Sequence, residues 1–199
     1  FVPVAEEAGL VGAIGEWVLR TACRQIRQWQ DAGYSLQIAV NVSAVQARHT
    51  DLVKEVIKAC EKHDVVPSDI EVELTESSIM DNLQKISPAF SKLRGIGVTI
   101  AVDDFGTGYS SFAYLRDLPV DVLKIDRSFI MNIEDKRRDR RILKTIIALG
   151  RDLCLDIVAE GVETQGQADI LMSYECRTVQ GYLFARPMPA KEFEAAFLS

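Results

Sequence analysis

The sequence predicts an α/β fold: a TIM-like (β/α)8 barrel, with about six of its eight strand–helix units present. Short apolar strands alternate with amphipathic helices along the whole chain, and this alternation indicates a parallel sheet. A polar side chain follows almost every strand. In an open sheet such residues gather at one switch point, whereas in a barrel all strand ends face one mouth, so the barrel is favoured. The two remaining units are expected upstream of Phe1.

The first half of the chain contains three predicted helices and three predicted strands. The helices follow the 3.6-residue apolar period, and the strands are short apolar runs bounded by turn residues. Residues 1–9 are expected to be an apolar segment that runs into an acidic turn. The helices are predicted at 14–30, 51–62 and 83–93, the last entered or interrupted at Ser87-Pro88, and the strands at 36–42, 70–74 and 98–102.

The second half continues the same alternation with shorter strands. A long helix with a basic N-terminal half and an apolar stripe is its most regular element. A short helix is predicted from Ser110 to Arg116, further helices at 137–153, 165–174 and 191–198, and strands at 122–125, 156–159 and 177–179.

Composition limits the classes of function. The chain has 199 residues, 48% of them hydrophobic, and a net charge of -6, so residues 1–199 are predicted to form one domain with one core. The acidic balance argues against a nucleic-acid polymer as partner but allows a small phosphorylated ligand bound with metal ions. The four cysteines form no CxxC pair, which favours free thiols in a reducing compartment and argues against zinc. We expect no signal peptide and no membrane segment in this chain.

The stretch from Thr99 to Ser111 organises the rest of the chain. An apolar β-branched run ends in the adjacent carboxylates of Asp103 and Asp104, and a Gly-x-Gly turn and two serines follow. Two neighbouring carboxylates at a buried strand end repel each other and lose solvation, and a bound cation would relieve both effects. The alternative interpretation is that the two aspartates only cap the next helix.

Polar residues at the other strand ends extend this pattern. Each alone has a structural interpretation: a snorkelling lysine, a helix N-cap, or an amide that satisfies loop backbone. Together they offer oxygen ligands without His or Cys, which suits Mg²⁺ or Mn²⁺. Two ions about 3.5–4 Å apart that share Asp103 could activate water for phosphoryl displacement. The set comprises Asn41, Glu73, Asp103, Asp104, Lys124, Glu160 and Gln180.

Several ordered motifs carry a resemblance to a known family. They are Phe1-Val2-Pro3-Val4-Ala5-Glu6-Glu7, Gly15-Glu16-Trp17-Val18-Leu19, Asn41-Val42-Ser43-Ala44, Glu73-Leu74-Thr75-Glu76-Ser77, Asp103 to Ser111, Leu123-Lys124-Ile125-Asp126, Ala159-Glu160-Gly161-Val162-Glu163-Thr164 and Gln180-Gly181-Tyr182-Leu183-Phe184. Over its whole length the sequence closely resembles the EAL family, the bacterial phosphodiesterases that hydrolyse cyclic di-GMP.

This resemblance implies a metal site and its ligands. The family has a TIM-like barrel with one irregular strand, is often dimeric, and uses two Mg²⁺ or Mn²⁺ ions, with Ca²⁺ expected to inhibit. Carried over, Asn41, Glu73 and Asp103 resemble the ligands of the first ion. Asp103 would bridge to a second ion, which lies beside Asp104 and Glu160.

The resemblance also implies roles in catalysis. Glu160 or a metal-bridging hydroxide would be the base, Lys124 would hold the attacking water and Gln180 would support the site. In-line attack on one 3′–5′ phosphodiester would give linear 5′-pGpG. Glu76 resembles the residue that anchors a loop coupling the site to the dimer interface. That loop comprises Phe105, Gly106, Thr107, Gly108, Tyr109, Ser110 and Ser111.

The Glu-Ala-Leu motif that names the family is absent from this sequence. In the family it lies on the second barrel strand, so it is expected upstream of Phe1 with a metal-binding glutamate and a phosphate-binding arginine. The chain is therefore interpreted as part of a truncated active domain, and we expect it to be inactive or nearly so. Regulatory domains are expected in a parent protein that is cytoplasmic or is the cytoplasmic part of a membrane-anchored bacterial sensor.

Two other classes of function remain open at this point. A barrel that lacks one metal ligand could bind cyclic di-GMP and report it to a partner without cleaving it. Carboxylates near a lysine on successive barrel strands also suit an enolase-like proton abstraction, or a Schiff base on Lys124.

Overall fold

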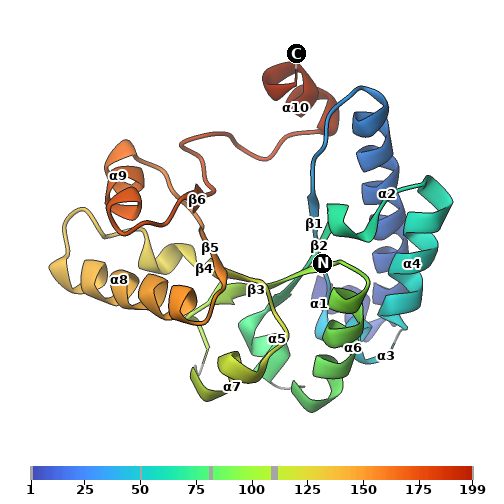
Figure 1. The fold of residues 1–199 in the computed structure, drawn as a ribbon, viewed down its shortest axis with the longest axis horizontal. Helices are drawn as coiled ribbons and strands as arrows, with labels where there is room; N and C mark the ends of the chain where they lie inside the picture. The colour runs from blue at the N-terminus through green and yellow to red at the C-terminus, as the bar shows by residue number, and fades with distance from the viewer. Residues whose placement is uncertain (1, 50, 81–82, 109–111, 199) are drawn as a thin grey trace. The chain divides into compact units, whose positions relative to one another are not determined.

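The computed structural model describes residues 2–49, 51–80, 83–108 and 112–198. Its six strands follow one another in the sheet in the order of the sequence, β1 to β6. The chain divides into two compact units (Figure 1). The first contains the residues up to Leu74, Ser78–Ile100 and those from Ala190 onward, and the second contains Thr75–Ser77 and Ala101–Pro189.

The first unit is built on two parallel strands and two long packed helices. Strand β1 pairs with β2 so that Val40 lies opposite Val72 and Asn41 opposite Glu73. Helix α2 buries one apolar stripe, and the side chain of Asp51 caps α4 by accepting a hydrogen bond from the Lys54 N–H at 3.3 Å. The elements are α1 (Val2–Glu7), α2 (Val11–Asp31), β1 (Ile38–Asn41), α3 (Ala44–His49), α4 (Leu52–His63), the 3₁₀ turn η1 (Pro67–Asp69), β2 (Ile70–Thr75), α6 (Leu83–Gly95) and α10 (Ala190–Phe197).

Helix α10, close to the C-terminus (Figure 1), belongs to the first unit and contacts α2. The Trp29 indole N–H and the Gln25 amide donate hydrogen bonds to one carboxylate oxygen of Glu194, at 2.9 and 3.0 Å. The Phe193 ring lies 5.6 Å from the Trp29 ring. These contacts combine aromatic burial with a shared acceptor, which together fix the position of α10 on α2.

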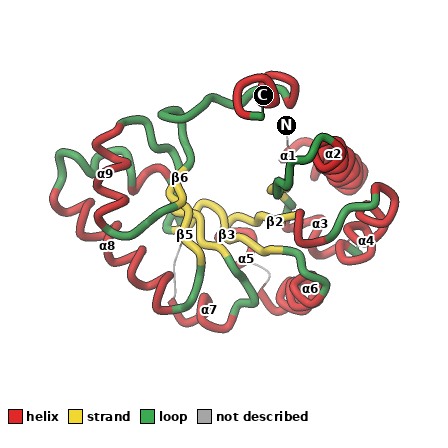
Figure 2. The backbone as a smooth tube through the Cα atoms, turned by 45° about the horizontal axis from the view of Figure 1, so that its top comes forward, coloured by secondary structure: helices red, strands yellow, loops and turns green. Residues whose placement is uncertain are grey.

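The second unit contains the strands that carry most of the predicted chemistry. Strands β3, β4, β5 and β6 pair in parallel, and Lys124 on β4 lies opposite Val158 on β5. Figure 2 shows strands of this unit side by side. Helix α8 contacts β5, and its buried residues include Leu143, Ile146 and Ile147. The elements are α5 (Glu76–Met80) and β3 (Thr99–Phe105), which lie partly in this unit, α7 (Phe112–Asp117), β4 (Val122–Ile125), η2 (Arg127–Phe129), α8 (Arg137–Asp152), β5 (Asp156–Ala159), α9 (Gln165–Ser173) and β6 (Thr178–Val179).

The structure confirms the predicted alternation and corrects it locally. All six strands occur, but β3 runs through Phe105 and so contains both aspartates instead of ending before them. Helices α1, α3 and α5 were not predicted, because each has only 5–6 residues and too few positions to show a helical period. Helix α6 runs through Pro88 without interruption, held by its buried residues Ile86, Phe90 and Leu93.

All four cysteines are free thiols. Cys23 on α2 and Cys60 on α4 share a hydrogen bond, and this bond and burial raise the pKa of the Cys23 thiol.

Among the described residues, no helix is both long enough and apolar enough to cross a membrane.

Candidate functional site

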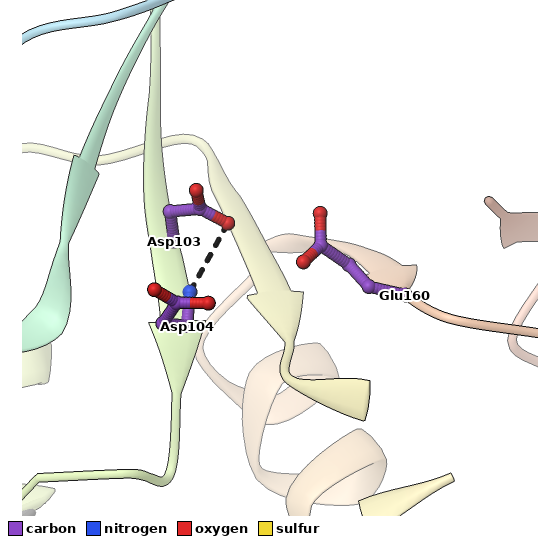
Figure 3. Close-up of side chains that lie close together, drawn as sticks. All are labelled: Asp103, Asp104 and Glu160. Atoms are coloured by element: carbon purple, nitrogen blue, oxygen red, sulfur yellow. Dashed lines mark hydrogen bonds between the residues drawn. The ribbon is translucent and has the colours of Figure 1, made fainter. Parts of the chain in front are cut away.

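Three carboxylates gather at one end of the second unit's strands. Asp103, Asp104 and Glu160 each offer one oxygen, and these oxygens all lie within 4.8 Å of one another. Figure 3 shows the Asp103 and Glu160 carboxylates facing each other from β3 and from the end of β5. All three side chains are partly buried, so their mutual repulsion is only weakly screened by water.

Lys124 places a cation between two of these carboxylates. Its Nζ lies 2.7 Å from Glu160 Oε1 and 3.2 Å from Asp103 Oδ1. The Lys124 side chain is 7% exposed, against 13% for Asp103 and 16% for Glu160. The snorkelling interpretation of Lys124 is therefore wrong, because the ammonium group is buried against two carboxylates instead of reaching solvent. One lysine offsets only part of the charge of three acidic side chains.

An irregularity in β3 allows both aspartates to join the cluster. In a regular strand neighbouring side chains point to opposite faces. Here the pairing register of β3 with β4 shifts between Val102 and Phe105, and Asp104 has a φ of 54°, in the left-handed region. The Asp104 N–H also donates a hydrogen bond to Asp103 Oδ1 at 3.1 Å. Non-glycine residues adopt this backbone conformation at a cost in energy, and such strain is concentrated at functional sites.

Glu160 is held in place through its main chain. It directly follows β5, and its N–H donates to the Ile125 carbonyl at the end of β4 at 3.0 Å. The N-cap of the following helix α9 is Thr164, whose hydroxyl accepts from the Gln167 N–H at 3.1 Å. Glu160 is therefore not the helix cap that the alternative interpretation proposed, and its side chain is available to the cluster.

Glu76 fixes the loop that follows Asp104. It is fully buried, and its Oε2 accepts hydrogen bonds from the Gly106 N–H at 2.8 Å and the Gly108 N–H at 3.4 Å. The Thr107 hydroxyl closes the turn by donating to the Asp104 carbonyl at 2.9 Å. Phe105, the first residue of the predicted loop, is the last of β3 and is buried. Ser110 and Ser111, the last two predicted residues of this loop, lie outside the described residues.

The remaining predicted site residues are Asn41, Glu73 and Gln180. Asn41 and Glu73 belong to the first unit, where they are paired in register on β1 and β2, with Glu73 buried and Asn41 exposed. Gln180 directly follows β6, and its N–H donates to the Ala159 carbonyl at 2.9 Å while its side chain is exposed. Of the predicted set, the second unit thus gathers Asp103, Asp104, Lys124 and Glu160 around one point.

Two residues near the cluster were missed by the sequence analysis. Gln167 and Glu134 both bind the loop that begins at Glu160: Gln167 accepts from the Glu163 and Thr164 N–H groups at 2.7 and 3.1 Å, and Glu134 accepts from the Thr164 hydroxyl at 2.8 Å. The T-x-x-Q spacing of Thr164 and Gln167 is a capping-box signal that could have identified one of them. Glu134 carries no comparable signal.

The donor set fits a hard divalent cation. Three carboxylates supply only oxygen ligands, which Mg²⁺ and Mn²⁺ prefer, and such an ion would offset the like-charge repulsion within the cluster. The structure thus supports a metal site at Asp103, Asp104 and Glu160.

Comparison with known families identifies this architecture. The EAL domain model matches residues 1–187. The chain belongs to the EAL domain family. It is 47% identical over 197 residues to the bifunctional diguanylate cyclase/cyclic di-GMP phosphodiesterase MucR of Pseudomonas aeruginosa, covering 98% of this chain and 29% of MucR. It is 46% identical over 195 residues to the cyclic di-GMP phosphodiesterase NbdA of the same organism, covering 98% of this chain and 25% of NbdA.

Solved structures of EAL domains confirm the fold. The P. aeruginosa MucR phosphodiesterase in complex with c-di-GMP superposes with a TM-score of 0.92 at 47% identity, covering 97% of this chain and 78% of that one. The EAL domain of Mycobacterium smegmatis DcpA gives 0.88 at 35% identity, covering 95% and 86%. The predicted TIM-like α/β fold and the predicted family are both confirmed. The chain spans about a quarter of the length of these curated relatives.

Proposed function

We propose that this chain is the catalytic part of an enzyme that hydrolyses cyclic di-GMP to linear 5′-pGpG. The observation that carries the proposal is the cluster of Asp103, Asp104 and Glu160 with Lys124 bound between two of its members. Relatives at 46–47% identity are named as cyclic di-GMP phosphodiesterases, which supports this substrate. Metal-assisted displacement at a phosphodiester needs clustered carboxylates of this kind.

Two divalent ions, Mg²⁺ or Mn²⁺, are proposed as cofactors. When bound, they supply Lewis-acid chemistry that acidifies water and stabilises the leaving oxygen. Asp103, Asp104 and Glu160 would hold them, and from the resemblance we propose Asn41 and Glu73 as further ligands. Ca²⁺ is expected to bind without supporting turnover.

The protein's own groups have separate roles in this proposal. Lys124 Nζ donates hydrogen bonds that orient the attacking water, since the Asp103 and Glu160 oxygens hold the ammonium group in place. Glu160 accepts the proton of that water. Glu76 keeps the loop after Asp104 in one conformation by accepting hydrogen bonds from the Gly106 and Gly108 N–H groups. Gln180 supports the site from the end of β6.

The 199 residues contain no Glu-Ala-Leu sequence, so this chain lacks the metal-binding glutamate that the motif supplies. We therefore propose that hydrolysis by the chain on its own is weak. A non-hydrolysing receptor for cyclic di-GMP is the second candidate, and the absence of this glutamate is the observation that favours it. We also propose a homodimer and a cytoplasmic location, with regulatory domains elsewhere in a larger protein.

A turnover assay separates these functions. The purified chain is incubated with cyclic di-GMP and Mg²⁺ or Mn²⁺, and the nucleotides are resolved by chromatography. Conversion to 5′-pGpG that disappears in Glu160→Gln but persists in Asp152→Asn, an exposed carboxylate at the end of α8, supports the phosphodiesterase. Calorimetric binding in Ca²⁺ without conversion in Mg²⁺ or Mn²⁺ supports the receptor. Absence of both binding and conversion contradicts both functions.

A further inference from the structure

We infer that Gln167, together with Glu134, is a positioning residue that holds Glu160 against Lys124 and so determines how tightly the carboxylate cluster binds a cation. The inference rests on the proposed function for its cation. Neither residue belongs to the cluster, and both contact the loop that begins at Glu160.

Gln167 ties two loops together from a buried position. Gln167 is only 5% exposed. Its Oε1 accepts from the Glu163 and Thr164 N–H groups in the loop after β5, at 2.7 and 3.1 Å, and its Nε2 donates to the Ile130 carbonyl in the segment after β4, at 3.5 Å. A capping-box glutamine needs only its own helix and loop. The third bond, to Ile130, connects the segments that follow Glu160 and Lys124.

Glu134 adds a second connection between the same segments. Its Oε2 accepts from the Thr164 hydroxyl at 2.8 Å. Its Oε1 occupies the space that a Cβ at Gly166 would need, only 2.0 Å from that position. Gly166 therefore admits the Glu134 carboxylate, and a larger residue there would displace it.

Main-chain hydrogen bonds also hold the loop after Glu160. The Val162 N–H donates to the Gln180 carbonyl and the Leu183 N–H donates to the Val162 carbonyl, both at 3.0 Å. Together with the bonds to Gln167 and Glu134, these bonds restrict movement of the segment from Glu160 to Thr164. This matters because the Glu160 carboxylate must remain within 4.8 Å of both aspartate oxygens to share a cation with them.

Groups that orient metal ligands from outside the ligand set alter metal affinity by about 10–100-fold when they are removed. Gln167 bonds to the loop and not to a ligand side chain, so we expect Gln167→Ala to weaken Mn²⁺ binding by about tenfold, the lower end of this range. Gln167→Glu keeps an acceptor oxygen for the two N–H groups but replaces the donor to Ile130 with a second acceptor and adds a negative charge; it should still retain more of the affinity than Gln167→Ala, which loses all three hydrogen bonds.

The experiment compares these variants with Asp51→Ala in the same 199-residue chain. Asp51 also caps a helix, α4 in the first unit, so its removal lowers stability without touching the loop after Glu160. Mn²⁺ affinity is measured by electron paramagnetic resonance, the ¹⁵N signal of the Lys124 ammonium group by NMR in the absence of metal, and the melting temperature by circular dichroism.

The expected result is a shifted Lys124 signal and weakened Mn²⁺ binding in Gln167→Ala, with both unchanged in Asp51→Ala although both variants melt at lower temperature. An unshifted Lys124 signal in Gln167→Ala overturns the inference, as does an equal shift in Asp51→Ala. If the Lys124 signal shifts as expected but the unsubstituted chain binds no Mn²⁺, the positioning role stands and the proposed metal-dependent function fails.

Discussion

Replacing Lys124 by methionine tests the electrostatics of the cluster directly. Methionine preserves most of the length and apolar volume of the lysine side chain and removes its charge together with its N–H donors. The variant leaves Asp103, Asp104 and Glu160 within 4.8 Å of one another without the ammonium group that lies 2.7 Å from Glu160 and 3.2 Å from Asp103. In metal-free buffer we expect a marked loss of stability.

The size of this loss can be worked from the distances. At an effective dielectric constant of about 20, two unit charges at the 4.8 Å limit repel by about 3.5 kcal/mol. Breaking a buried ion pair by removing one partner costs about 3–5 kcal/mol, and the 7–16% exposure of these side chains places the site near the lower end. A loss of about 3 kcal/mol lowers the melting temperature of a chain of this size by about 6–12 °C.

The assay is thermal unfolding in EDTA and then in increasing Mg²⁺ or Mn²⁺. A bound divalent ion replaces the missing positive charge, so the cation should raise the melting temperature of Lys124→Met more than that of the unsubstituted chain. At 100 times its dissociation constant a ligand adds about 2.7 kcal/mol. Lys191→Met, at an exposed lysine on α10, is the control and should leave both curves unchanged. A melting temperature within about 2 °C of the unsubstituted chain in EDTA would refute the reasoning, since that is less than the shift expected for 1 kcal/mol.

Substitutions at three further positions are tested by thermal unfolding and Mn²⁺ titration. Burial, and then the nearby Glu16 and Asp51, raise the pKa of Glu55, so its ionisation lowers stability as pH rises through that pKa. Glu55→Gln should therefore melt higher than the unsubstituted chain at neutral pH and no higher once the pH is below the ordinary glutamate pKa; an equal melting temperature at neutral pH would contradict this. Asp104→Asn should melt higher in metal-free buffer, because it removes one of the three clustered negative charges, and should weaken Mn²⁺ binding. Asp104→Ala should be less stable than Asp104→Asn by about 1–2 kcal/mol, and so melt lower, because alanine tolerates a φ of 54° less well; equal melting of the two variants would count against backbone strain at this position. Gly106→Ala should cost about 2 kcal/mol, or about 4–8 °C, because its φ is 98° and its Cβ would lie 2.4 Å from the Phe129 ring; unchanged melting would show that this loop relaxes freely.

Much of the fold, and the residues of the carboxylate cluster with Lys124, follow from sequence pattern alone. Strands of a parallel sheet are short apolar runs between amphipathic helices, so their number and order could be read along the chain. The strand ends share one edge of such a sheet, which explains why the sequence alone predicts Asp103, Lys124 and Glu160 to lie together. Periodicity and topology are sufficient for residues of this kind.

Contacts that depend on side-chain direction in loops could not be predicted in this way. Gln167 and Glu134 act through hydrogen bonds between segments that are 30 or more residues apart, and no period or spacing connects Glu134 with Thr164. The five-residue helix that begins at Glu76 is too short to show a repeat, so the sequence indicated a loop anchor at Glu76 only through the family resemblance. Tertiary packing determines these features.

The bend at Asp104 combines a residue that the sequence pattern identifies with a backbone conformation that the pattern does not predict. A regular β3 would place neighbouring aspartates on opposite faces, and one carboxylate would be lost to the cluster. The register shift after Val102 and the left-handed backbone of Asp104 bring both to one side, next to Glu160. The bend imposes backbone strain and also brings like charges together, so folding alone gives no reason to keep it. A cation shared by the three carboxylates would compensate for the like-charge repulsion, and this makes the irregular strand itself an argument for a metal site.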